Sequence, residues 1–133
     1  MAFEKSANSC FVCGPANSSG LKVEFQMQED VCCAEFTPGV DQMGYDNVTH
    51  GGILFSLLDD VMANWLWLQG EACFTARAEV RYRKQVAVGT PILLEGRMIK
   101  RKGPLAVMQG SILRASDGVL LVEANASFML RKI

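Results

Sequence analysis

One short stretch carries the residue types that most readily do chemistry in this chain. His50 is the only histidine, and Gly51 and Gly52 follow it directly. Asp59 stands nine residues after the histidine, with Asp60 beside it. Imidazole and carboxylate groups transfer protons, and exposed backbone N–H groups bind a developing negative charge. The stretch therefore indicates acid–base chemistry on a polarised carbonyl.

The pair of glycines lies where a helix is expected to begin. Glycine disfavours a helix by roughly 1 kcal/mol relative to alanine, so we expect a reason for the pair. Bare N–H groups at a helix N-terminus carry partial positive charge and attract anions. Because Gly51 lacks a Cβ, a ligand carbonyl can approach its N–H closely. His50 would orient this loop or hydrogen-bond a substrate, although a histidine beside a helix start is ordinarily structural.

Asp59 is expected to point away from the apolar face of this helix. At about 100° per residue it shares a side with the small residues Gly52, Ser56 and Ala63. Burial in a slot of this kind raises the pKa of a carboxylate and makes it a stronger base. A solvated helix acid is the alternative. We expect Asp60, further round the helix, to have a structural role such as pairing with a basic residue of a strand.

The surrounding pattern predicts an α+β fold with one long helix. Apolar residues recur at helical spacing over 51–69, on a face made of Leu54, Leu57, Leu58, Val61, Trp65 and Leu68. Thr49 is the expected cap of this helix. Alternating apolar and polar residues predict strands over 21–28, 31–36, 73–86, 91–101, 105–115 and 119–130. A single helix covers only one face of such a sheet, so the sheet should curl around it.

Length and charge narrow the possible functions. The 133 residues fit one domain, 1–133, and 13 Lys and Arg nearly balance 14 Asp and Glu, which argues against nucleic-acid binding. The start of the chain lacks the apolar segment of a secretory signal. The longest apolar run, 53–68, contains acids and falls short of the roughly 20 residues that span a bilayer. We therefore expect a cytoplasmic protein that does not bind a membrane.

The five cysteines favour reduced thiols, because their number is odd and no secretory signal precedes them. Cys10-x-x-Cys13-Gly14 is half of a zinc-ribbon pattern, and the second half would need another spaced pair. Cys32 and Cys33 are adjacent, and a strand sends adjacent side chains to opposite faces. We therefore predict no metal site and interpret the pattern as small buried residues or a turn.

The segment GYDNVTHGGILFSLLDD resembles the motif of hotdog-fold acyl-CoA thioesterases of the phenylacetate-pathway (PaaI-like) type, in the 4-hydroxybenzoyl-CoA thioesterase superfamily. Their pattern is roughly G-Y-x-x-x-x-H-G-G, with an acid nine residues after the histidine. The opening CFVCGPANSSGL and the strand ARAEVRYRKQVAVGTPI are also similar, so the resemblance covers residues 10–95. Gly44 fits this pattern, but relatives often carry a polar Asn or Gln at the same position, six residues before the histidine, and Asn47 is the candidate to replace that side chain.

The resemblance implies a hotdog fold, in which a curled antiparallel six-stranded sheet wraps around one long central helix. It also implies a homodimer, or a homotetramer built as a dimer of dimers, with active sites at the dimer interface. The implied activity is hydrolysis of an acyl-CoA to a free acid and CoA. No metal or other cofactor is required, because a thioester is reactive enough for one base and one oxyanion site.

The same resemblance implies catalytic roles for Asp59, Gly51 and His50, and it places Thr75 among the residues that contact the substrate. Asp59 would attack the thioester carbonyl or activate water. The N–H of Gly51 from the partner subunit would polarise that carbonyl. His50 and the loop before it would shape the site, and Thr75 would hydrogen-bond near the attacking water.

The substrate contacts and two alternative functions complete the expectation. Gly52 and Asn47 are candidates for contact with the substrate, and the CoA phosphates would bind residues 100–102 or Arg81 and Arg83. A hydroxyacyl thioester dehydratase is one alternative, in which the acid at position 59 and the histidine at position 50 act as an acid–base pair. A non-catalytic acyl-CoA-binding protein is the other.

Overall fold

The computed structural model describes residues 7–131. Residues 1–6 and 132–133 lie outside the described part. The prediction that the chain starts without a secretory signal therefore falls mostly on residues that the structure does not describe. Across residues 7–131 the chain forms six strands, a short 3-10 turn and one long helix, which confirms the expected α+β class. Their bounds are β1 Gln26–Gln28, β2 Val31–Phe36, η1 Val40–Gln42, α2 Gly51–Trp67, β3 Ala72–Tyr82, β4 Ile92–Lys102, β5 Leu105–Arg114 and β6 Leu120–Arg131.

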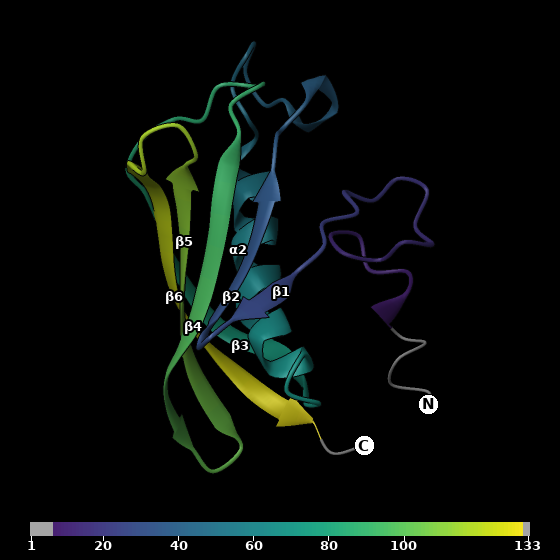
Figure 1. The fold of residues 1–133 in the computed structure, drawn as a ribbon, viewed down its shortest axis with the longest axis vertical. Helices are drawn as coiled ribbons and strands as arrows, with labels where there is room; N and C mark the ends of the chain where they lie inside the picture. Colours follow the sequence, from purple (N-terminus) through teal and green to yellow (C-terminus); the bar gives the residue numbers. More distant parts are fainter. Residues whose placement is uncertain (1–6, 132–133) are drawn as a thin grey trace.

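The strands form one sheet with α2 against one face (Figure 1). Neighbouring strands are antiparallel and follow the order β1-β2-β4-β5-β6-β3. α2 packs mainly against β2, β3, β4, β5 and β6, with β4 as its most extensive neighbour. One helix therefore covers a six-stranded antiparallel sheet, as expected from the sequence.

The first strand is shorter than expected. The alternation over 21–28 predicts a strand of that length, whereas β1 begins only at Gln26. Upstream of it, the N–H of Leu21 donates to the carbonyl of Phe11 at 2.8 Å. Lys22 has a φ of +55°, which an extended strand does not allow. This part of the chain therefore pairs with the N-terminal loop and not with the sheet. The other strands match their expected bounds within four residues.

The helix begins at Gly51, as expected, and ends at Trp67. Its cap is His50, because the imidazole Nδ1 accepts a hydrogen bond from the N–H of Gly52 at 2.8 Å. The prediction of Thr49 as the cap is wrong: its side chain points into the interior and is only 3% exposed. None of the helices within residues 7–131 has the length and apolar character needed to cross a bilayer.

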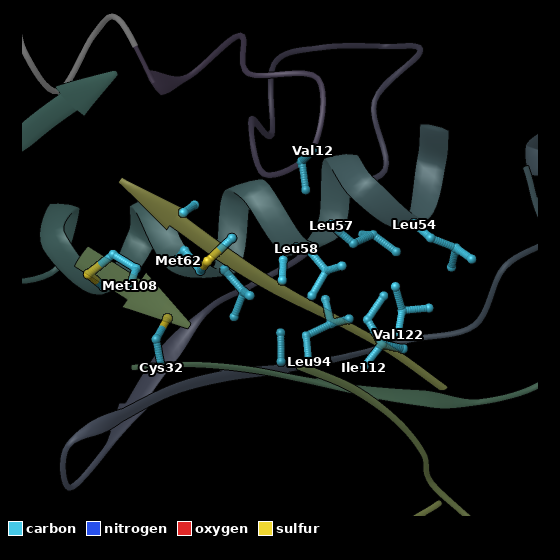
Figure 2. Close-up of a cluster of buried hydrophobic side chains, with 14 of the residues drawn as sticks. Val12, Cys32, Leu54, Leu57, Leu58, Met62, Leu94, Met108, Ile112 and Val122 are labelled. Carbon is cyan, nitrogen blue, oxygen red and sulfur yellow. The ribbon is translucent and has the colours of Figure 1, made fainter. Parts of the chain in front are cut away.

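The core lies between α2 and the sheet (Figure 2). The buried residues of α2 are Leu54, Leu57, Leu58, Val61, Met62 and Leu66. Met62 and Leu66 take the places of Trp65 and Leu68 in the expected face. Trp65 lies at its border, where the indole N–H donates to the carbonyl of Asp30 at 2.8 Å, and Leu68 is exposed. The apolar face is therefore rotated slightly from the one expected.

Glycine in β4 sets how closely the helix approaches the sheet. A Cβ at Gly96 would lie 2.7 Å from the carbonyl oxygen of Val61, so no other residue fits without moving the helix. A Cβ at Gly110 in β5 would lie 3.2 Å from the side chains of Leu58 and Met62. These contacts hold the turn of α2 that carries Asp59 at a fixed depth.

β3 is a long edge strand. Its 11 residues pair with β6 on one side, and no strand within residues 7–131 pairs with its other side. Residues 74–79 and 81–82 are exposed. An open strand edge of this length presents unpaired backbone groups that another strand can bind. This edge is therefore a natural surface for association.

Candidate active site

Asp59 and Thr75 come together from different elements. Asp59 lies in the middle of α2, and Thr75 lies in β3, 16 residues further along the chain. Oγ1 of Thr75 donates a hydrogen bond to Oδ1 of Asp59 at 2.5 Å. The two residues that the sequence assigns to the base and its neighbour are therefore in direct contact.

The surroundings of Asp59 favour proton transfer. Burial raises the pKa of its carboxyl group above the ordinary value, and the hydrogen bond from Thr75 opposes this rise. Among residues 7–131, no Lys or Arg forms an ion pair with Asp59. Its second oxygen, Oδ2, accepts no hydrogen bond from the described residues, so it remains available to a water or a substrate.

A β-bulge positions Thr75. The register between β3 and β6 shifts between Thr75, which lies opposite Phe128, and Arg77, which lies opposite Ser127. Ala76 is the extra residue. Bulges bend a strand and redirect its side chains, and they are common next to functional sites. Here the bulge lies directly beside the residue that contacts Asp59.

The start of α2 presents an unoccupied donor. His50 caps the N–H of Gly52, and the N–H groups of Ile53 and Leu54 donate to the carbonyl of His50. The N–H of Gly51 has no partner among residues 7–131. Gly51 is also exposed. A free N–H at a helix N-terminus is suited to bind a carbonyl oxygen that gains negative charge.

A cavity of about 700 Å³ opens at this helix start and is lined by His50, Gly51 and Tyr82. Tyr82 donates from its hydroxyl to the carbonyl of Gly51 at 2.9 Å, so the ring lies over the first turn. The hydroxyl of Thr49 is buried beside this cavity without a hydrogen-bond partner among the described residues. An unpaired buried hydroxyl is unusual, and this one can hydrogen-bond to a molecule that enters the cavity. The volume falls in the usual range for ligand sites, roughly 300–1,000 Å³.

Asp59 and Gly51 of one chain cannot meet at the same carbonyl. Eight residues of helix separate them, which corresponds to about 12 Å along the axis. Asp59 also does not line the cavity at Gly51. The two halves of the expected site therefore lie at separate places on one subunit.

The other residues predicted to contact the substrate differ in whether they reach the cavity. Gly52 lies tightly against the cap, since a Cβ there would be 3.0 Å from the imidazole of His50. Asn47 has a φ of +65° and is exposed, and it does not line the cavity. Gly44 does line it, and a Cβ at that position would lie 3.2 Å from Cα of His50. A longer residue at 44 would therefore need this loop to shift.

The basic residues expected to bind phosphate also differ in position. Arg83 lines the cavity at Gly51 together with Lys84, and it pairs with Glu123. Arg101 forms a double hydrogen bond with Glu71, at 2.9 Å for both contacts, just after the C-terminal end of α2. Residues 100–102 of one subunit therefore lie at the opposite end of the helix from its Gly51.

Asp60 does not pair with a basic residue of a strand, so the expected ion pair is wrong. Its Oδ2 accepts a hydrogen bond from Nδ2 of Asn64 at 3.0 Å, and its Oδ1 accepts one from the thiol of Cys10 at 3.6 Å. Within residues 7–131 no ion pair involves Asp60. The helix turns Asp60 away from the exposed basic strands and toward the N-terminal loop.

Sequence reasoning missed three residues around the cavity, which are Thr49, Tyr82 and Lys84. Tyr82 and Lys84 become relevant only because β3 ends beside the start of α2. Tyr82 stands at the end of the strand that carries Thr75. This shared strand is the one feature of the sequence that links Tyr82 to the site.

Comparison with known proteins identifies related families and folds. The family model described as the Thioesterase superfamily matches residues 46–121, more than half of the chain. A solved structure of a thioesterase superfamily protein is 26% identical, with a TM-score of 0.83 over 90% of this chain, and this chain covers 62% of that protein's length. The E. coli PaaI protein from the phenylacetic acid degradation operon is 17% identical, with a TM-score of 0.77, over 84% of this chain and 81% of that one.

A hypothetical thioesterase from Streptococcus pneumoniae TIGR4, solved with coenzyme A, is 18% identical with a TM-score of 0.76, over 81% of this chain and 87% of that one. Structures of two mutants of this protein, one with a threonine and one with an aspartate replaced by alanine, are also similar. These matches confirm the hotdog fold.

One curated protein also matches part of the chain. The 3-hydroxyacyl-[acyl-carrier-protein] dehydratase FabZ of Lactococcus lactis subsp. cremoris (strain SK11) is 35% identical over 65 residues. The match covers 48% of this chain and 44% of that dehydratase, so less than half of either protein is aligned.

Proposed function

Because this chain belongs to the Thioesterase superfamily, we propose that it hydrolyses an acyl-CoA thioester to a free acid and CoA. The observation that carries the proposal is the partly buried carboxylate of Asp59, which Thr75 holds by one oxygen while the other stays free. Asp59 takes a proton from water as the water attacks the thioester carbonyl. The C–S bond then breaks, and the CoA sulfur leaves as a thiolate that takes up a proton.

Two copies of the chain are needed to complete this site. Asp59 and Gly51 of one chain lie about 12 Å apart along α2, too far to act on one carbonyl. β3, which carries Thr75, has an open edge of 11 residues. We infer a homodimer that forms along this edge and brings Gly51 of the partner subunit toward Asp59. The free N–H of Gly51 then binds the carbonyl oxygen as negative charge develops on it.

The cavity beside Gly51 is the proposed site for part of the CoA moiety. Its lining combines a free amide, the unpaired hydroxyl of Thr49 and the basic residues Arg83 and Lys84. The N–H of Gly51 is taken by the thioester carbonyl, so the phosphate groups would bind the basic side chains. The related Streptococcus pneumoniae protein was solved with coenzyme A, which supports the same class of ligand.

The mutants of that protein give independent support for the catalytic pair. The aspartate and the threonine replaced there are 16 positions apart in its chain. Asp59 and Thr75 have the same separation, |i−j| = 16. We propose that they act as a pair here, with Asp59 as base or nucleophile and Thr75 as the residue that positions it.

The dehydratase match favours a second candidate, the elimination of water from a hydroxyacyl thioester. In that reaction Asp59 would act with His50 of the partner subunit. Because Nδ1 of His50 accepts the N–H of Gly52, the ring proton lies on Nε2, which then has no lone pair to take a proton from a hydroxyacyl substrate; this supports hydrolysis instead.

Product analysis separates the candidates. The purified protein is incubated with a panel of saturated acyl-CoAs, aryl-CoAs and 3-hydroxyacyl-CoAs. Free thiol is measured with a thiol reagent, and acyl products are measured by mass spectrometry. Hydrolysis gives equal amounts of free CoA and acid. An enoyl thioester without free thiol would identify a dehydratase, and unchanged substrates that remain bound would identify a binding protein.

A further inference from the structure

The N-terminal loop and α2 bring a second set of reactive groups together. Single side-chain atoms of Cys10, Cys13 and Asp60 lie within 4.8 Å of one another. The cysteines come from the loop before β1, and Asp60 lies in α2, 50 residues after Cys10. Within residues 7–131 no other group of three thiols, carboxylates or imidazoles converges in this way.

The loop forms a tight turn around the two cysteines. The N–H of Gly14 donates to the carbonyl of Cys10 at 2.9 Å. A Cβ at Gly14 would lie 2.3 Å from the backbone nitrogen of Cys10, so only glycine fits directly after Cys13. The turn places both thiols on the side that meets the helix. Two cysteines separated by two residues are a common unit of structural zinc sites.

The carboxylate of Asp60 is already oriented toward the thiols. Nδ2 of Asn64 holds its Oδ2 at 3.0 Å and also donates to the backbone carbonyl of Asp60 at 2.9 Å. This leaves Oδ1 directed at Cys10, with an Sγ–Oδ1 distance of 3.6 Å. A carboxylate that binds a metal through one oxygen is typically fixed by a hydrogen bond to the other.

The charge around this cluster lacks a counterion. Asp60 forms no ion pair within residues 7–131, although α2 and the N-terminal loop cover much of it. A cavity of about 200 Å³ adjoins the cluster, and its lining includes Glu71, Cys73 and Arg131. Glu71 is already paired with Arg101, and within residues 7–131 Arg131 forms no ion pair with Asp60, so no side chain of this lining neutralises Asp60. A carboxylate that is largely removed from water is stabilised further by an opposite charge, and a cation fits this position.

We propose that Cys10, Cys13 and Asp60 bind one Zn²⁺ ion that fastens the N-terminal loop to α2. In a tetrahedral zinc site the ligand atoms are roughly 3.5–3.8 Å apart, so the three groups need to close only slightly. Two thiolates and one carboxylate favour zinc over the harder Mg²⁺ and Ca²⁺. The fourth position opens on the adjoining cavity, where water completes the set. This site is independent of the proposed hydrolase function.

The sequence does not predict this site because the third ligand lies in the helix, far along the chain from the two cysteines. Cys10-x-x-Cys13 has no second cysteine pair, and the sequence therefore predicts no metal. The third ligand is an acid 50 residues away that only the fold brings near.

Zinc content and cobalt spectroscopy test the proposal on the full-length protein. Protein produced with added zinc is desalted and analysed for metal by mass spectrometry. We expect about one zinc per chain in the native protein. Cys10→Ser and Cys13→Ser should lose most of it, and Asp60→Asn should bind zinc at least ~10-fold more weakly. With Co²⁺ in excess in place of zinc, the thiolate–cobalt absorption per bound metal should fall by about half in each single cysteine variant.

Cys33→Ser is the matched control, because Cys33 is another partly exposed thiol but lies in β2 outside the cluster. It should keep the zinc and the cobalt spectrum of the native protein. A chelator should lower the thermal midpoint of the native protein and of Cys33→Ser, but not that of Cys10→Ser. The proposal is overturned if the native protein binds no zinc, if Cys33→Ser loses as much zinc as Cys10→Ser, or if thiol titration finds a Cys10–Cys13 disulfide in the fresh protein.

Discussion

The hydroxyl of Thr75 donates to the carboxylate of Asp59 across a distance of 2.5 Å, from the edge strand β3 to the helix α2. This contact fixes the orientation of the carboxylate and leaves its second oxygen free. It also places the proposed base beside the strand edge at which a second copy would bind. The proposed chemistry and the proposed assembly therefore depend on the same strand.

Thr75→Val should slow catalysis without unfolding the protein. The change keeps the size of the side chain but removes the hydrogen bond to Asp59. A hydrogen bond to a charged group contributes about 1.5–3 kcal/mol, so we expect kcat to fall by roughly 10- to 100-fold. Thr75→Ser keeps a hydroxyl and should retain most of the activity. Equal kcat values for Thr75→Val and the native protein would show that the hydroxyl does not position the base.

Gly51→Ala should separate stability from activity. A Cβ at Gly51 would lie 3.6 Å from the ring of Tyr82, an ordinary contact, so the variant should fold. Alanine favours a helix by up to ~1 kcal/mol, so the free energy of unfolding should stay the same or rise. The added methyl group obstructs the approach of a carbonyl to the N–H, and kcat/KM should fall by about 10-fold or more.

Gly39→Ala is the control for this experiment, because Gly39 lies outside the cavity and a Cβ there meets only Oε1 of Gln42, at 3.5 Å. It should leave kcat/KM unchanged. If Gly51→Ala is also fully active, the amide at the helix start has no role in the reaction.

His50→Ala should destabilise the fold through the loss of the helix cap. The imidazole Nδ1 accepts the N–H of Gly52 at 2.8 Å, and loss of an N-cap typically costs about 1 kcal/mol. His50→Asn supplies another good capping side chain and should recover most of the loss. Urea unfolding of the three proteins measures this directly. Equal destabilisation by both substitutions would mean that His50 acts by some means other than the cap.

Thr49→Val should affect binding and not stability. The hydroxyl of Thr49 is buried without a partner among residues 7–131, and valine has nearly the same shape. Removing an unsatisfied buried hydroxyl should leave the thermal midpoint unchanged or raise it. If the hydroxyl binds the acyl-CoA, KM should rise by about 5- to 10-fold, the effect of losing one hydrogen bond of roughly 1 kcal/mol. An unchanged KM with a raised midpoint would leave Thr49 without a ligand contact.

The helix and most of the strands follow from local patterns in the sequence. The apolar spacing from Leu54 to Val61 identifies α2, and alternation identifies β2 to β6, because one face of each element is buried. The errors arise where a distant segment competes with the local pattern. Leu21 pairs with the N-terminal loop and not with β2, and Thr49 turns inward so that His50 becomes the cap.

The candidate site was only partly accessible from the sequence. The positions of Asp59, Gly51 and Thr75 follow from the motif and its spacing. The contact of Asp60 with Cys10 and the position of Tyr82 over Gly51 depend on segments 50 and 31 residues apart, which no local pattern reports.

The most direct test of the central claim compares thiol release from the best acyl-CoA substrate by the native protein and by Asp59→Asn. Both proteins are used at the same concentration, after both have been shown to fold and to have the same oligomeric state. Asparagine has the shape of aspartate and can still contact Thr75, but it cannot take up a proton. We expect native hydrolysis and a loss of at least ~100-fold in kcat/KM for Asp59→Asn, the usual contribution of a general base. Equal rates of thiol release from the two proteins would contradict the account.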